Sequence, residues 1–111
     1  MPLVFFDPGQ RTARLELRRP VSSPDGQGGA AVSFETVAAL WARIEPMNHA
    51  LTEDASQREV ILTHRIWIAR RDGVQAGMRF VKGARVFAIR AVHDPDETQR
   101  YLVCHCEEDG A

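Results

Sequence analysis

The chain has 111 residues, of which 44% are hydrophobic and 26% are charged, and its formal net charge is −1. This length fits one domain without a second independent core, so we expect a single β domain over residues 1–111, with 1–10 and 107–111 as flexible tails. A net charge near zero argues against a protein whose main work is binding phosphate backbones. The apolar run at the N-terminus is too short for a signal peptide and no run is long enough for a membrane helix, which favours a cytoplasmic protein.

Short turn signals divide the chain into runs of the length of β-strands. Residues 13–18 alternate apolar and charged side chains, the pattern of a half-buried strand. Residues 20–31 are rich in proline and glycine, which predicts a flexible loop. Residues 37–45 fit either a helix or a strand, and we favour a strand that Pro46 ends.

The second half of the chain gives clearer signals. Residues 60–69 show the longest alternation, with Ile66 and Ile68 on one face and Trp67 on the other. Residues 85–93 are apolar on both faces, with Ala91 expected on the same face as Phe87, which indicates a central strand. Residues 98–106 predict a last strand.

Between these regions, Thr52 is followed by two acidic residues, which predicts one short helical turn within residues 52–57. Five or six strands joined by short turns indicate an all-β fold. We expect a small antiparallel β-barrel or sandwich with long loops and at most a short helix.

Two cysteines, Cys104 and Cys106, flank His105 near the C-terminus. Successive side chains of a strand point to opposite faces, so His105 is expected to face away from both thiols. A tetrahedral zinc site would need further ligands, and the spacing of the other histidines recommends none. We therefore expect two packed thiols, no metal site and no cofactor.

Catalytic motifs are not evident in the sequence. There is no Gly-x-Ser-x-Gly segment, and residues 73–77 (GVQAG) lack the Lys-Ser/Thr pair of a phosphate-binding loop. The acidic clusters coincide with turns or with the end of the chain, where a solvated surface explains them. The sequence predicts no enzyme and no catalytic residues.

Aromatic and basic residues allow one alternative, an oligonucleotide-binding β-barrel module. Such barrels stack bases on aromatic side chains and follow the backbone with cations. The candidates for stacking are Trp41, Trp67, Phe80, Phe87 and Tyr101, and the candidate cations are Arg65, Arg70, Arg71, Arg79 and Arg85. Aromatic residues on strands are more often core residues, and arginine is also enriched at protein interfaces.

Five segments in order carry a family resemblance: residues 40–46 (LWARIEP), 63–70 (THRIWIAR), 77–80 (GMRF), 83–89 (GARVFAI) and 100–104 (RYLVC). They resemble the phage head–tail adaptor family, which includes head-closure or stopper proteins and the neck proteins of gene transfer agents. The resemblance covers residues 15–108. The chain departs from the family pattern at Ala69, before Arg70, and at Ala84, between Gly83 and Arg85.

The resemblance implies a structural connector in the neck of a tailed phage or phage-like particle. Its members are expected to form a ring of six or twelve copies that joins head to tail and helps to retain the packaged DNA. The implied partners are the other copies, a portal–adaptor ring above, a tail terminator or tail tube protein below, and double-stranded DNA in the lumen, contacted without sequence specificity. Assembly is expected in the bacterial cytoplasm, with no membrane partner.

Two loops are the candidate contact sites. Residues 47–57 form a connection longer than the roughly 2–5 residues of an ordinary hairpin, and long loops are often functional. We expect this connection to face the channel or a neighbouring subunit through Asn48, His49, Leu51, Thr52, Glu53 and Asp54. The competing loop lies at residues 20–29 and offers Asp25, Gly26, Gln27 and Gly28.

Overall fold

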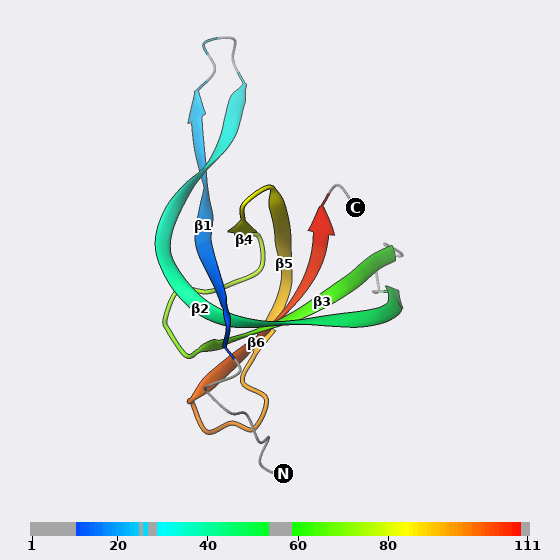
Figure 1. Cartoon of the computed structure of the whole chain (residues 1–111). Coiled ribbons are helices and arrows are strands. Elements are labelled where there is room, and N and C mark those ends of the chain that lie inside the picture. Colours follow the sequence, from blue (N-terminus) through cyan, green and yellow to red (C-terminus); the bar gives the residue numbers. More distant parts are fainter. Residues whose placement is uncertain (1–10, 25, 27–28, 54–58, 110–111) are drawn as a thin grey trace.

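A computed structural model describes residues 11–24, 26, 29–53 and 59–109 (Figure 1). Within these ranges the chain forms six strands and no helix. They are β1 (Ala13–Pro24), β2 (Ala30–Glu53), β3 (Glu59–Ala69), β4 (Arg79–Lys82), β5 (Arg85–His93) and β6 (Tyr101–Asp109). All pairings are antiparallel, and the order β1-β2-β3-β6-β5-β4 closes a barrel. The predicted all-β antiparallel fold is confirmed, and of the two architectures expected, barrel or sandwich, the strands form a barrel.

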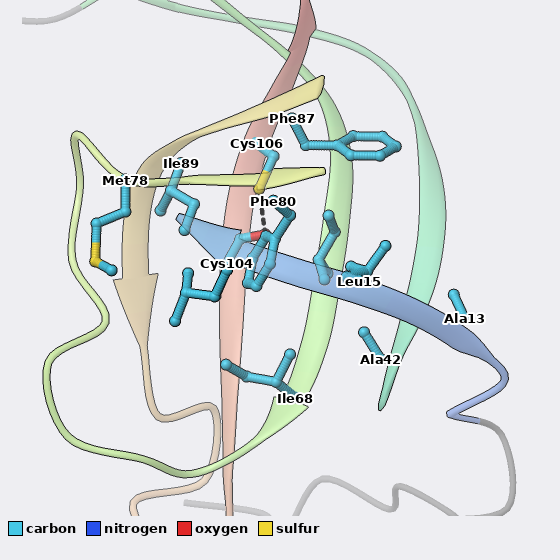
Figure 2. Close-up of a cluster of buried hydrophobic side chains, with 12 residues drawn as sticks. Ala13, Leu15, Ala42, Ile68, Met78, Phe80, Phe87, Ile89, Cys104 and Cys106 are labelled. Carbon is cyan, nitrogen blue, oxygen red and sulfur yellow. Dashed lines mark hydrogen bonds between the residues drawn. The ribbon is translucent and has the colours of Figure 1, made fainter. Parts of the chain in front are cut away.

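The barrel core is built from alternate residues of its strands. Ala13, Leu15 and Leu17 of β1 are buried, as are Ile66 and Ile68 of β3. Phe80 and Phe87 lie opposite each other across β4 and β5, and both are fully buried (Figure 2). Burying one such side chain contributes roughly 1.5–3 kcal/mol, so these period-2 patterns dominate the stability of the fold.

A bulge in β5 corrects one expectation about the core. The register shifts between Ile89 and Ala91, so Arg90 is the extra residue, and Ala91 is exposed instead of facing inward with Phe87 as the alternation predicts. Val92 turns toward the core in its place. One extra residue reverses the alternation beyond it, which a simple period-2 pattern cannot reveal.

Two predicted loops are largely strand. The predicted loop at residues 20–31 is wrong at both ends, because β1 continues to Pro24 and β2 begins at Ala30. Residues 47–53 also belong to β2, so the long connection and the helical turn expected there are corrected as far as Glu53. The remaining residues of these loops, 25, 27, 28 and 54–57, lie outside the described residues.

Pro46 does not end its strand. It lies inside β2 opposite His64, and the register shifts between Pro46 and Ala50. Proline is tolerated in a sheet beside such an irregularity, since it has no N–H to give to the ladder.

At the C-terminal end, the last strand begins at Tyr101 rather than at Thr98. Glu107, Glu108 and Asp109, expected in a flexible tail, belong to β6 and pair with β5. Residues 1–10 and 110–111, the rest of the expected tails, lie outside the described residues. No helix in the part of the chain that the structure describes has the length and apolar character needed to cross a membrane.

Candidate functional site

The thiols lie in the core and not at a reactive site. Cys104 and Cys106 are fully buried, and the Cys106 thiol donates to the Cys104 carbonyl oxygen at 3.5 Å (Figure 2). Burial raises the pKa of Cys104 to about 12 and also raises the pKa of Cys106, so both remain protonated at neutral pH. A thiol in this state is a poor nucleophile and a poor metal ligand.

His105 faces the other side of the sheet, as its position between the two cysteines predicts. Its ring stacks on His93, with 4.9 Å between centroids, beside Trp67 and Val103 in a pocket of about 350 Å³. The pKa of His105 is lowered, first by burial and then by the charges of His93 and Arg65. Over residues 11–24, 26, 29–53 and 59–109, no group of three or more His, Cys, Asp or Glu side chains is arranged to hold a metal ion.

The most distinctive surfaces are two hairpins that extend beyond the barrel. The first arm pairs Arg19–Pro24 of β1 with Ala30–Glu35 of β2 and projects away from the barrel (Figure 1). Its described strand residues beyond the Arg19–Glu35 pair carry no charge, and Val32 is 64% exposed. An apolar arm held out in this way is suited to contact with protein.

Polar contacts fix the base of the first arm. Arg19 forms an ion pair with Glu35 across the two strands. Glu16 accepts from Arg18 and from Thr36, and the hydrogen bond from Arg18 is the main cause of the lowered pKa of Glu16. The arm therefore has a defined exit from the barrel.

The second arm pairs Ala50–Glu53 of β2 with Glu59–Leu62 of β3. It contains the predicted site residues Leu51, Thr52 and Glu53, and Asn48 and His49 lie on β2 just before it. Asp54 lies outside the described residues. The candidate contact loop is thus mainly part of a β-hairpin.

Of the competing loop, the structure describes Gly26, whose φ of 81° is a left-handed conformation suited to glycine. Asp25, Gln27 and Gly28 lie outside the described residues. The strands of the first arm point in a different direction from those of the second arm (Figure 1).

A basic pocket of about 650 Å³ lies where β1 begins and β3 ends. Trp41 is half exposed there, Arg14 stacks over its ring at 5.3 Å, and Arg70 pairs with Asp72 at 3.2 Å. The lining residues are Arg11, Thr12, Leu40, Trp41, Ile68, Ala69, Arg70 and Arg71. The pocket offers an aromatic surface inside a positive field, which favours a carboxylate or a phosphate.

Among the remaining aromatic and basic candidates, Trp67 and Arg65 line one pocket with His105, whereas others are buried or paired. Phe80 and Phe87 are core residues, so neither can stack a base. Arg65 pairs with Glu45, and Arg85 pairs with Glu108. The sequence patterns alone did not distinguish Trp41 from the buried aromatics, because each lies on an alternating strand.

The described chain is thus a closed barrel with a packed interior and two protruding hairpins, and its accessible features lie on its surface. A family model described as "Phage head completion protein" matches residues 6–109. The chain belongs to this family, as its resemblance to head–tail adaptor proteins predicted. The family is one of structural phage proteins and not of enzymes.

Two solved structures have the same fold. The first, titled "Virion of native gene transfer agent (GTA) particle", has a TM-score of 0.68 and 24% identity and covers 90% of this chain and 96% of that chain. The second is the solution structure of protein SF1141 from Shigella flexneri 2a, with a TM-score of 0.68 and 23% identity over 95% of this chain and 98% of that chain. No curated protein matches the chain.

Proposed function

We propose that the chain forms a ring in the neck of a tailed phage or phage-like particle, joins the head to the tail and helps to retain the packaged DNA. Membership of the head completion family carries this proposal. The first neighbour above, a chain of a gene transfer agent virion, supports a place in such a particle through its fold. The partners would be other copies, a portal–adaptor ring above and a tail terminator or tail tube protein below.

The two arms supply the contacts that this function needs. The second arm, with Asn48, His49 and residues 51–54, would face the channel or a neighbouring subunit. The first arm, together with residues 25–28 that follow β1 in the sequence, would reach an adjoining ring. A net charge of −1 suits a lumen that lets double-stranded DNA pass, because strong binding to phosphates would retard its exit.

Ring contacts of this kind are heterologous and close by rotation. In dilute solution we expect a monomer or a weak oligomer that assembles on its upstream partner in the bacterial cytoplasm. A stable two-fold dimer that persists inside particles would contradict the proposal.

The deciding experiment removes the gene from a producing strain and examines the particles by electron microscopy. We expect heads without attached tails and loss of packaged DNA, with both defects reversed by the wild-type gene. Particles that still join tails and hold DNA would overturn the proposal.

Shortened arms then separate folding from function. Deleting residues 50–62 leaves a short connection between Pro46 and His64, which pair in the wild-type sheet. The matched variant replaces residues 20–34 with Asn-Gly, a two-residue hairpin turn between Arg19 and Glu35. If the variant lacking residues 50–62 folds and its particles retain DNA and join tails normally, the second arm is not the working part.

A further inference from the structure

Several strand edges of the described chain lack a pairing partner, including one on β2 and one on β3. From Ala31 to Trp41, β2 pairs with β1 on one side, and no described strand pairs with its other side. From Glu59 to Leu62, β3 pairs with β2 but not yet with β6, whose pairing begins at His64. An open edge presents a row of free N–H and C=O groups to other chains.

The exposed apolar side chains lie on the same two edges. Among the described residues, the large hydrophobic side chains that are exposed are Val32, Val37, Trp41 and Ile61. The first three are on the open part of β2, and Ile61 is on the open part of β3. Soluble proteins usually protect open edges with charges, proline or bulges. Charged residues are few on these two edges.

The open edge of β1 in the first arm differs in this respect. Pro20 and Pro24 lie on it, and neither has an N–H to donate to a further strand. Between Ala31 and Trp41, β2 contains no proline, and its one charged residue, Glu35, is paired with Arg19. The β2 edge has a bulge at Val37, where the register with β1 shifts, but residues 38–41 beyond it contain neither proline nor charge, so this stretch is the one left open to a further strand.

Charge identifies the covering strand. Glu53 and Glu59 are directly opposite each other at the end of the second arm, and residues 53–59 contain three acids and one arginine. Like charges placed directly opposite are destabilising unless a cation lies near them. The basic pocket with Arg11, Arg70 and Arg71 lies at the Trp41 end of the open β2 edge.

We propose that neighbouring copies in the ring are joined by antiparallel β-pairing of Glu59–Leu62 of one copy with residues 38–41 of the next. In this register Ile61 lies opposite Ala39, and Glu59 lies beside Trp41 and the basic pocket. The two surfaces differ, so the contact is head-to-tail and can propagate around a ring. The inference rests on the proposed function and specifies the contact that makes the ring.

Disulfide cross-linking within particles tests the contact. Ala39→Cys and Ile61→Cys are combined in one chain, and Val37→Cys or Trp41→Cys replaces Ala39→Cys to scan the register. Little cross-linking is expected through the native cysteines, because both thiols are buried. We expect the double variant to give a ladder of covalent multimers after oxidation, and each single variant to stay monomeric.

The outcomes separate the two proposals. Particles that lack the protein would overturn the proposed function. Particles that contain the protein but give no ladder with any of the three pairs would overturn the edge contact alone. Covalent dimers from Ala39→Cys alone would also overturn it, since they require two β2 edges to meet.

A charge exchange tests the direction of the contact. Glu59→Arg or Arg71→Glu alone should lower incorporation into particles roughly tenfold or more, because like charges then face each other across every contact. The double variant should recover, and the two single variants expressed together should form mixed rings. Lys82→Glu, a charge reversal at an exposed residue that lines neither the basic pocket nor the two edges, is the matched control and should incorporate normally. Failure of the double variant and the mixture to recover would contradict this pairing.

Discussion

Strand β2 passes through two environments, and its halves behave differently. Ala42 pairs with Ala13 of β1 and Ile68 of β3, and its side chain is fully buried in the barrel. Val32 pairs with Ser22 of β1 alone and is mostly exposed. One continuous strand therefore supplies both the closed core and an open arm, which separates the residues that stabilise the fold from those available for assembly.

The largest expected effect tests the barrel half of this comparison. Phe80→Ala should lower the free energy of unfolding by about 3–5 kcal/mol, because Phe80 is fully buried against Phe87 and its loss leaves a cavity. Urea unfolding followed by tryptophan fluorescence measures the change. Val32→Ala on the first arm is the control and should stay within about 0.5 kcal/mol of wild type. Equal losses would show that the arm is part of the core.

The second prediction concerns pH and the buried thiols. Cys104 has its pKa raised to about 12 and the pKa of Cys106 is also raised, whereas both thiols ionise near 8.5 in the unfolded chain. The contribution of the two thiols to the free energy of unfolding is therefore fully present below that pH. It is lost as pH rises, by up to about 1.4 kcal/mol per pH unit for each thiol, because only the unfolded chain then releases the protons.

The free energy of unfolding, measured between pH 8 and pH 11, should therefore fall more steeply in wild type than in the variant with both cysteines replaced by Ala. That variant should fold and enter particles with a modest loss of stability. Identical slopes for the two proteins would contradict the burial of the thiols.

The third prediction concerns the loop between β5 and β6. Asp96 is buried, and its carboxylate accepts from the Thr98 N–H at 3.2 Å and from Arg100 at 3.3 Å. Asp96→Ala should cost about 1–3 kcal/mol, because the substitution removes the hydrogen bonds that this buried carboxylate accepts. Glu97→Gln, on the exposed neighbour, should leave the melting temperature unchanged. If Asp96→Ala left the melting temperature unchanged, the loop would not support the barrel.

Much of the barrel could be predicted from the sequence because its signal is local. A strand with one buried face alternates apolar and polar residues, so the local sequence of residues 13–18 and 60–69 was enough to predict strands there. The arms could not be recognised in this way. A hairpin with no core beneath it has no buried face to impose alternation, so residues 20–24 and 47–53 looked like loops.

The candidate interface was missed for a related reason. A strand edge is open when no neighbouring strand pairs with it. Whether this is so depends on where β3 and β6 end and not on the sequence of β2. The exposure of Trp41 and Val37 follows from that pairing and not from their hydropathy. The sequence did indicate Glu53 and Asp54 as candidate contact residues, but it did not reveal the basic pocket, whose residues come from separate strands.

The smallest expected effect tests the arm half of the comparison. Replacing residues 20–34 with Asn-Gly removes most of the first arm but keeps Arg19 and Glu35, whose ion pair closes its base. The replacement also removes Phe34, on whose ring Arg79 of β4 stacks at 3.3 Å from the centroid, and such cation–π interactions contribute about 0.5–1 kcal/mol at exposed sites. We therefore expect the free energy of unfolding to fall by no more than about 1 kcal/mol, with a slightly smaller denaturant slope because less surface is exposed on unfolding. Urea unfolding of the shortened and full-length chains measures both quantities. A loss as large as that of Phe80→Ala would mean that the arm stabilises the barrel, and the division of β2 into a stabilising half and a contact half would be wrong.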